Sequence, residues 1–419
     1  MDKIKVLITG PVNGSFTDLS AKLTSLQKSK AGPFDICFCV GPFFSDTNST
    51  SGTSDADGNG NGNVKSNADS RSSSIQKELE GIPLPLYFCD VGSLPSGYTL
   101  PGVDFGAEKA KDDAEISLDD DDNNDDDNDN ENDNNDDEGV PKRSKGIIRV
   151  APNVHYLHGI SASASSSATT TQTADIVNIY PDDMSNDKTY LTVAFVPPNA
   201  RMHSLQSAIL ESKTNHASYV GCDLLLTSDW GQGMASSACI AKDDLVKLGN
   251  DNSNSNSNSN KMNEVGSYDV AEMASRCRPR YHVTPSILLG QGQGPIPEKE
   301  SFFIQSLQYT NPPSAMASGV MKNYHTSRFL SLCPVVDAKT QKKNGKTKKY
   351  IHALGIQPLW SMDRITATKI PENTVVVPCP YTDEHYEKDG NRNGSGNFAS
   401  GTVASGMNMN TNMNMNSSS

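Results

Sequence analysis

The sequence lacks the features of membrane and secreted proteins. No apolar run approaches the ~20 residues that a membrane-spanning helix needs. Met1-Asp2-Lys3 leads directly into a strand pattern that is too short for the apolar part of a signal peptide. None of the 8 cysteines belongs to a Cys-x-x-Cys pair. We therefore expect a soluble intracellular protein with no membrane partner, whose reduced cysteines are small buried apolar residues.

Several familiar catalytic and nucleotide-binding motifs are also missing. The chain has neither a Gly-x-Ser-x-Gly elbow nor a His-x-His-x-His string. Lys346-Thr347 after Gly345 resembles the end of a phosphate-binding loop, but Thr340 stands where that loop needs its first glycine. His155 and His158 are three residues apart, on opposite faces of a predicted strand, so they do not share a ligand. No cofactor is predicted.

The negative charge of the chain is concentrated in one stretch. Asp119 to Glu138 holds 13 carboxylates, and without them the formal net charge of −14 becomes −1. The acidity therefore belongs to an insertion and says little about the partners of the folded part. The basic stretch from Pro141 to Lys145 has two interpretations, a weak nuclear-import patch or a solvated loop end.

Low-complexity composition divides the chain. Tracts rich in Gly, Asn, Ser and Asp predict disordered insertions at about 45–75, 106–145, 161–175 and 249–263. Within residues 1–363 the remaining sequence is predicted to form one folded domain. Residues 364–419 are predicted to be a linker and a low-complexity tail. Roughly 290 residues remain for folding, which is enough for a large core.

The apolar patterns predict an α/β fold with a parallel sheet. Lys5–Thr9, Phe34–Val40 and Leu84–Cys89 are strand-like runs that each end in a turn bearing glycine. Cys222–Thr227 is apolar without alternation, which is typical of a strand buried on both faces. It ends at Ser228-Asp229-Trp230, and ligands of such folds bind beyond the carboxyl ends of the strands.

Further elements follow from periodicity. Helices are predicted from about Thr17, over 204–212 and over Val270–Arg276, and strands over His155–Ile160 and Leu191–Val196. Late in the chain, Ser327–Val336 and Lys349–Gln357 are β-rich runs joined by a lysine-rich loop that contains Asn344-Gly345. This dipeptide predicts a hairpin between them.

Six motifs in order carry a resemblance to a known family. They are Gly10–Phe16, Val40–Phe44, Asp223–Trp230, Arg278–His282, Thr326–Phe329 and Lys349–Leu354. Together they resemble the amino-terminal half of the CwfJ family of splicing factors, which is similar to lariat debranching enzyme and to the metallophosphoesterases. The resemblance implies a four-layer α/β sandwich of two mixed β-sheets flanked by helices. The carboxyl-terminal domains of that family are absent from this sequence.

The catalytic relatives hold two metal ions where the strands end, and the resemblance implies that this chain has lost their ligands. Pro11 and Asn13 stand in place of Asp-x-His, and Pro42 replaces the carboxylate that bridges the metals. Ser228-Asp229 lies where a histidine is expected. Two cations need several charged ligands to lie close together. We therefore predict no catalytic residues and no metal site.

Two sets of residues leave functional alternatives open. The first is basic and comprises Arg276, Arg278, Arg280, His282, His325 and Arg328. In the implied fold its two segments converge near the former metal site. There these residues either contact phosphate, RNA or a partner, or they pair with core carboxylates and hold strands in place. The second set, Asp90, Asp229 and His282, is the only sensible ligand set for a residual metal-dependent phosphodiesterase acting on RNA or nucleotides.

The resemblance also implies a function. It predicts a non-catalytic pre-mRNA splicing factor of the nucleus, associated with the late intron-lariat spliceosome. Such a factor promotes lariat debranching and turnover through contacts with spliceosomal proteins, lariat debranching enzyme among them, or with RNA.

Overall fold

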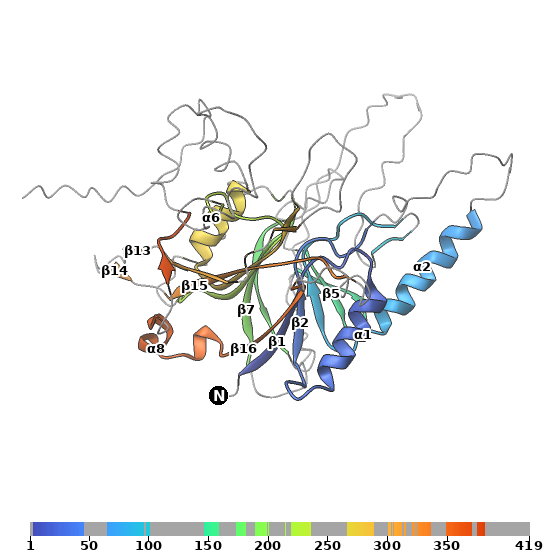
Figure 1. The fold of residues 1–419 in the computed structure, drawn as a ribbon, viewed down its shortest axis with the longest axis horizontal. Helices are drawn as coiled ribbons and strands as arrows, with labels where there is room; N and C mark the ends of the chain where they lie inside the picture. Colours follow the sequence, from blue (N-terminus) through green and yellow to red (C-terminus); the bar gives the residue numbers. More distant parts are fainter. Residues whose placement is uncertain are drawn as a thin grey trace, which may run out of the picture. The chain divides into compact units, whose positions relative to one another are not determined.

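The structure is a computed structural model of the chain, and its described residues form two mixed β-sheets with helices on their outer faces (Figure 1). The structure describes residues 3–45, 65–95, 98–100, 146–158, 173–181, 189–198, 200, 214, 219–235, 266–288, 301–302, 304, 306–311, 314–315, 321–322, 325–336, 349–370 and 375–381. Several predicted segments lie outside the described residues. They are the insertions 106–145 and 249–263, nearly all of the insertion 161–175, and the helix predicted over 204–212.

The first sheet has six strands in the order β16, β1, β2, β3, β5, β4. The inner strands β1, β2, β3 and β5 are parallel, and the edge strands β16 and β4 are antiparallel to their neighbours. Their bounds are β1 Ile4–Thr9, β2 Ile36–Cys39, β3 Leu86–Phe88, β4 Ile147–Ala151, β5 Val154–Leu157 and β16 Ile351–Ile356.

The second sheet has seven strands in the order β17, β12, β15, β9, β8, β7, β6. Its strands β15, β9, β8 and β7 are parallel to one another. The bounds are β6 Asp175–Ile179, β7 Leu191–Val196, β8 Cys222–Thr227, β9 Pro279–Pro285, β12 Leu307–Thr310, β15 Thr326–Leu332 and β17 Val376–Val377. Two short ladders join β10 (Ile287–Leu288) to β11 (Ser301–Phe302) and β13 (Ser314–Ala315) to β14 (Met321–Lys322).

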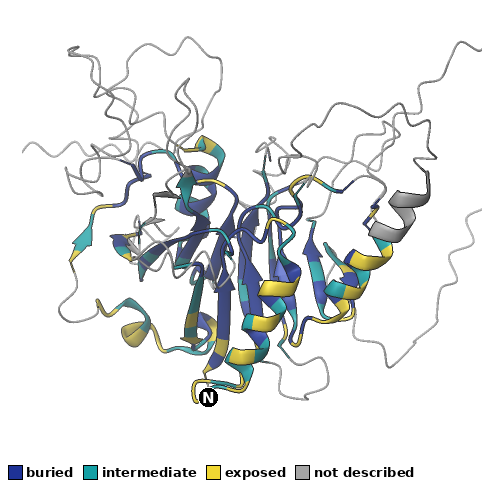
Figure 2. Ribbon diagram, turned by 45° about the vertical axis from the view of Figure 1, so that its right-hand side comes forward, coloured by how far each residue is buried: buried dark blue, intermediate teal, exposed yellow. Residues whose placement is uncertain are grey.

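Three apolar layers hold these elements together. The central layer lies between the sheets, where Val6 and Ile8 of β1 pack with Leu224 and Leu226 of β8. Alternation along β1 sends Leu7 to the opposite face, into the layer beneath α1 (Phe16–Gln27) and α2 (Lys65–Glu80). A third layer lies between the second sheet and α6 (Tyr268–Cys277). Because the inner strands of both sheets are buried on both faces (Figure 2), the predicted four-layer α/β sandwich of two mixed sheets is confirmed.

The parallel strands of both sheets end on the same side of the sandwich. A Cβ placed on Gly10, after β1, would lie 2.1 Å from the carbonyl oxygen of Cys333, just after β15. A Cβ on Gly41, after β2, would lie 3.0 Å from Cβ of Pro285, the last residue of β9. The carboxyl ends of the two sheets therefore meet, and the amino ends lie on the opposite side.

The predicted hairpin between Ser327–Val336 and Lys349–Gln357 is wrong. β15 belongs to the second sheet and β16 to the first, where β16 pairs antiparallel with β1. The Asn344-Gly345 signal is local, whereas pairing is decided by which sheet edge offers a partner and an apolar face.

Two predicted boundaries also need correction. The insertion predicted over 45–75 runs into α2, whose Ile75 and Leu79 pack on the first sheet. The segment after Asp363 adds the short helix α8 (Arg364–Thr368) and β17, and it buries Cys379 and Tyr381. One compact unit extends to Thr382, because these late apolar side chains fill the third layer.

Two expectations about composition can be compared with the described residues. Their cysteines are buried and none forms a disulfide, which confirms the prediction that they act as small apolar residues. In the part of the chain that the structure describes, no helix combines the length and apolarity that crossing a bilayer requires.

Candidate functional site

The carboxyl ends of the strands are closed by backbone contacts between neighbouring turns. Pro42 O accepts hydrogen bonds from the amides of Val12 and Asn13, at 3.0 and 3.1 Å. Pro11 O accepts one from Val335 N at 2.8 Å, and Phe43 N donates to Asp90 O at 3.0 Å. These bonds satisfy the turn backbone internally, so its polar groups are not directed at a ligand.

Proline and glycine fill the space where these turns approach one another. Gly41 has φ +78, and a Cβ there would lie 2.7 Å from Cγ of Pro11. Gly92 has φ +71, and its Cβ would lie 3.0 Å from Cβ of Pro42. The two prolines therefore pack against glycine backbone, and their rings carry no atom that can bind a metal ion. Asn13 has a left-handed backbone with φ 49, and its carbonyl accepts from Ser45 Oγ at 2.9 Å.

Asp90 is the buried carboxylate of this region. Its Oδ1 accepts from Gly92 N at 2.9 Å, and the Ser228 hydroxyl also hydrogen-bonds to it. Burial raises the pKa of Asp90 to about 6, and the two hydrogen bonds partly offset that effect. The hydroxyl of Tyr156 is also buried and has no hydrogen-bond partner among the described residues. Burial raises the pKa of this hydroxyl, and the charges of Cys89 and Asp90 add to that effect.

His282 is held by two neighbours. The Thr227 hydroxyl donates to Asp229 O at 2.7 Å, so its oxygen accepts from His282 Nε2 at 3.3 Å. His282 Nδ1 then accepts from the Tyr381 hydroxyl at 3.1 Å. Burial lowers the pKa of His282 to about 3, so the ring is neutral. Both of its nitrogens are used within the layer beneath α6.

Asp229 lines a cavity. The cavity has a volume of about 290 Å³ and lies between the ends of β7 and β8 and the start of α6; it is lined by Val196, Pro197, Ala200, Asp229, Ser267, Asp269 and Val270. Although the Asp229 side chain reaches solvent, its partial burial raises its pKa. The Ser267 hydroxyl caps α6 by accepting from Val270 N at 3.4 Å.

These donors do not fit a dinuclear metal centre. Asp90 lies between the turns, whereas His282 contacts Phe329 and Tyr381 in the third layer. Within the described residues, no group of three or more His, Cys, Asp and Glu side chains is arranged to hold a metal ion. A pair of cations needs several charged ligands in one place, and in this region Asp90 and His282 are hydrogen-bonded to protein partners.

The predicted basic residues lie side by side, because β9 pairs with β15 and Arg328 is in register with Tyr281. They do not, however, lie at the turns that follow β1 and β2. Arg280 is the second residue of β9 and Pro285 the last, a separation of about 16 Å along an extended strand. Arg276, Arg278, Arg280, His325 and Arg328 therefore lie at or near the amino ends of the strands.

Arg280 fastens the strands at that end. It donates to Gln357 O at 2.8 Å and to Met362 Sδ at 3.3 Å. Its charge also stabilises the carboxylate of Asp223, which is fully buried and accepts from Thr192 N and Leu359 N at 2.9 and 2.7 Å. Burial outweighs these interactions and raises the pKa of Asp223 to about 6. These contacts favour the structural interpretation of Arg280.

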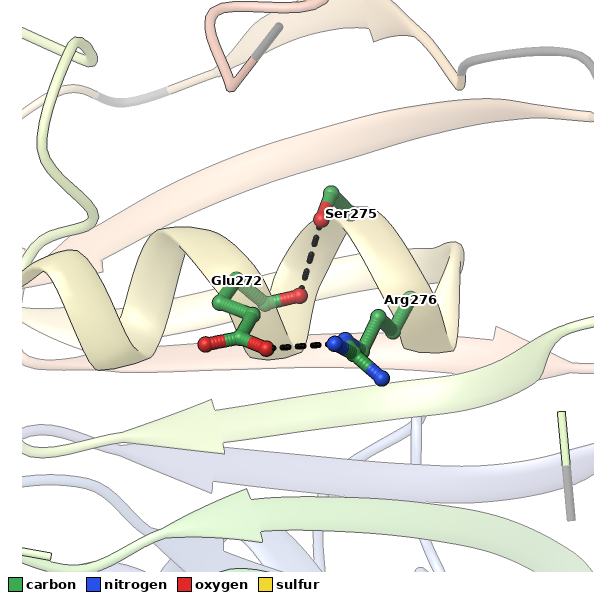
Figure 3. A network of polar contacts seen from close by, with 3 residues as sticks. All are labelled: Glu272, Ser275 and Arg276. Carbon is green, nitrogen blue, oxygen red and sulfur yellow. Dashed lines mark hydrogen bonds and ion pairs between the residues drawn. The ribbon is translucent and has the colours of Figure 1, made fainter. Parts of the chain in front are cut away.

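Arg276 and Arg278 also contact nearby protein groups. Arg276 forms an ion pair with Glu272 at 2.7 Å on the same face of α6 (Figure 3). Arg278 caps that helix with a left-handed backbone and donates to Arg276 O at 3.2 Å. His325 is buried, and that burial lowers its pKa to about 4. In these contacts neither guanidinium group, that of Arg276 or that of Arg278, is directed into a cavity.

Three structurally important residues were missed by sequence reasoning. Asp223 links β7 to the turn after β16, Tyr381 covers His282, and Trp360 stacks on Tyr190. A signal was present for two of them. Trp360 is one of only 2 tryptophans in the chain, and Tyr381 follows Pro-Cys-Pro inside a polar tail.

Comparison with known proteins gives a weak similarity. No family model matches the chain. The CWF19-like protein 1 homolog of Caenorhabditis elegans is 21% identical over 374 residues, which are 89% of this chain and 47% of that protein. The chain is similar to CWF19/CwfJ-type proteins. It spans about half the length of the curated relative it matches.

Proposed function

We propose that this chain is a non-catalytic pre-mRNA splicing factor built on a metallophosphoesterase-like domain. It acts in the nucleus on the late, intron-lariat spliceosome and promotes debranching and turnover of the lariat. Two observations support the assignment to splicing: the CwfJ-like motifs, and the similarity to a CWF19-like protein over 89% of the chain.

One observation carries the non-catalytic part of the proposal. The turns after β1 and β2 are closed on one another by Pro11, Gly41 and Pro42, and their backbone groups are bonded to neighbouring turns. A phosphoesterase needs metal ligands and open space at this place. Here the space is filled by rings and backbone.

The alternative is a residual metal-dependent phosphodiesterase that uses Asp90, Asp229 and His282. This activity requires the three side chains to converge on one ion. Both ring nitrogens of His282 are hydrogen-bonded, one to Thr227 and one to Tyr381. Asp90 accepts hydrogen bonds from Gly92 and Ser228. These contacts support the non-catalytic function over the alternative.

The proposed partners are spliceosomal proteins, with lariat debranching enzyme first among them, and RNA. A factor without its own chemistry raises turnover by holding enzyme or substrate in place, because positioning alone lowers the barrier of the catalysed step. The proposal therefore needs a binding surface outside the closed turns.

Debranching kinetics test the proposal. Purified chain is added to lariat debranching enzyme and branched RNA, and the initial rate of branch cleavage is measured. We expect the rate to rise with chain concentration until it saturates. As a control, the chain is combined with debranching enzyme whose catalytic residue is replaced, and no cleavage is expected. Cleavage in that control, or a rate that the chain does not change, would contradict the proposal.

A further inference from the structure

An arginine without a protein partner lies between the two sheets, at an edge of the central apolar layer. Arg328 shares a face of β15 with Leu330 and Leu332, which pack in that layer. Arg328 is half-buried, yet within the described residues it makes no hydrogen bond and no ion pair. A partly buried charge that the protein leaves unpaired is costly, so an anion from outside is favoured beside it.

Gln308 lies next to Arg328 on the neighbouring strand β12. The two residues are directly opposite in the antiparallel ladder, so their side chains leave the sheet on the same face. Gln308 is only 7% exposed, and its side-chain oxygen has no hydrogen-bond partner among the described residues. A guanidinium whose fork faces an anion has further N–H groups for an acceptor beside it. Gln308 is therefore placed to hold the guanidinium in one orientation.

Two more nitrogen-bearing side chains come from β16, the edge strand of the first sheet. His352 shares a face of β16 with Leu354 and Ile356, which belong to the same central layer. Lys349 precedes β16, and its carbonyl accepts from Cys333 N at 3.0 Å. This bond fixes the start of β16 against the end of β15, so the two strands face one another across the layer.

The charges around His352 are positive. The pKa of His352 is lowered to about 4 by burial, then by the Lys349 charge and by the Arg328 charge, and no carboxylate of the described residues contributes. The composition of the links on either side of β15 has the same sign. Residues 312–325 carry one lysine and no carboxylate, and residues 337–348 carry five lysines and one aspartate. A negative charge is therefore stabilised beside the neutral imidazole.

We infer that Arg328, His352 and Lys349 bind a phosphate group, with Gln308 as the positioning residue of the arginine. We call these four residues the phosphate cluster. A phosphate offers oxygens in several directions, which suits donors that arrive from two sheets, whereas a carboxylate is matched by one arginine fork. The inference rests on the proposed function, in which the phosphate belongs to the RNA backbone; a free nucleotide offers the same group.

RNA binding tests the inference. The full chain is titrated with a labelled single-stranded uridine oligonucleotide, and anisotropy is followed at several salt concentrations. We expect Arg328→Gln to weaken the affinity about tenfold and to reduce the slope of log K against log salt by about 0.7, the loss of one phosphate contact. Arg276→Gln removes the same charge from α6 and is the matched control, with no change expected. Equal affinity in Arg328→Gln and the wild type overturns the inference.

Two further variants keep the test decisive if Arg328→Gln disturbs folding. Arg328→Lys keeps the charge but loses the fork, and we expect it to weaken RNA binding about threefold. Gln308→Leu removes the acceptor without adding a charge. We expect it to weaken binding about threefold in the wild type and less in Arg328→Lys, because Gln308 acts through the fork. Full affinity in both single variants contradicts the inference.

Inorganic phosphate distinguishes the two sources of the group. The full chain is titrated with phosphate, or with chloride at equal ionic strength, and the histidine rings are followed by NMR, with the His352 signal assigned by its loss in His352→Gln. A bound phosphate favours the charged imidazole, so we expect phosphate to raise the pKa of His352 in the wild type but not in Arg328→Gln. Such a rise without Arg328-dependent RNA binding supports the phosphate cluster and assigns it to a free phosphate compound. No rise beyond that in chloride overturns the inference.

Two other outcomes also separate the possibilities. If Arg328→Gln binds RNA and phosphate normally but no longer binds purified debranching enzyme, the surface is a protein interface and the inference fails. Because RNA binding is measured without debranching enzyme, its failure leaves the stimulation of debranching to be decided separately. A chain that binds RNA through the phosphate cluster but does not stimulate cleavage refutes the proposed function alone.

Discussion

At their carboxyl ends the parallel strands are closed by proline and glycine packed on backbone, whereas at their amino ends they present arginine, aspartate and exposed aromatic rings. Pro11, Gly41 and Pro42 fill the first region. Arg280, Asp223 and Trp360 organise the second. In open α/β folds the carboxyl ends usually bind the ligand. In this chain the carboxyl ends are filled by proline rings and glycine backbone, and the aromatic rings that reach solvent lie at the opposite end.

The largest effect is expected from adding a methyl group to the closely packed turns at the carboxyl ends of the strands. Gly10→Ala places a methyl group 2.1 Å from Cys333 O, and both backbones must shift. We expect the free energy of unfolding to fall by about 3 kcal/mol, the upper range for overpacking. Urea denaturation measures it. Gly355→Ala is the matched control, because its nearest neighbour is Lys3 Cδ at 3.5 Å and the change should be within ~0.5 kcal/mol.

His282 is expected to make a contribution of comparable size to the pH dependence of stability. The folded pKa of His282 is about 3, below the usual value of 6.5, so the unfolded chain binds the proton first and stability falls as the pH drops below 6.5. Between pH 6.5 and pH 4 this loss amounts to about 3 kcal/mol. Asp90 and Asp223 act in the opposite sense, because their raised pKa values make the folded state bind protons first from about pH 6 downward.

His282→Gln isolates the histidine contribution. Glutamine keeps hydrogen-bonding groups for Thr227 and Tyr381 but does not titrate. We expect the slope of unfolding free energy against pH, measured by denaturation at several pH values, to lose the contribution of about one proton. An unchanged slope would mean that His282 is not buried as described.

Arg280 separates the two interpretations of the basic residues. Arg280→Ala removes the bond to Gln357 O and the charge beside Asp223. We expect a loss of about 2 kcal/mol in stability, because a buried carboxylate loses its cation, while RNA affinity stays unchanged. If Arg280→Ala weakens RNA binding in a protein that remains folded, the phosphate-binding interpretation is correct.

The smallest effect is expected at Arg276. Its ion pair with Glu272 is an i,i+4 pair on a partly exposed helix face (Figure 3), so Arg276→Ala should cost about 0.5 kcal/mol or less. Thermal melting at low and high salt measures it. A larger cost, or weaker RNA binding, would assign Arg276 a role beyond the helix.

The sequence predicted the fold where apolar runs were uninterrupted. β7 and β8 were expected with the bounds that they have, because both are buried on both faces and leave no alternation to misread. The hairpin prediction was wrong because β16 pairs with β1, which is more than 340 residues away in the sequence. The loss of ligands at Pro11 and Pro42 remains an inference from the resemblance. The stacking of Trp360 on Tyr190 could not be predicted, because the two residues are 170 positions apart in the sequence.

Metal content tests the central claim most directly. The purified chain is equilibrated with Mn²⁺, Zn²⁺ or Fe²⁺, the bound metal is counted, and branched RNA is supplied as substrate. We predict no stoichiometric metal and no cleavage, in the wild type and equally in Asp90→Asn. Two metal ions per chain, with cleavage that disappears on replacing Asp90, Asp229 or His282, would contradict the account and make this chain a phosphodiesterase.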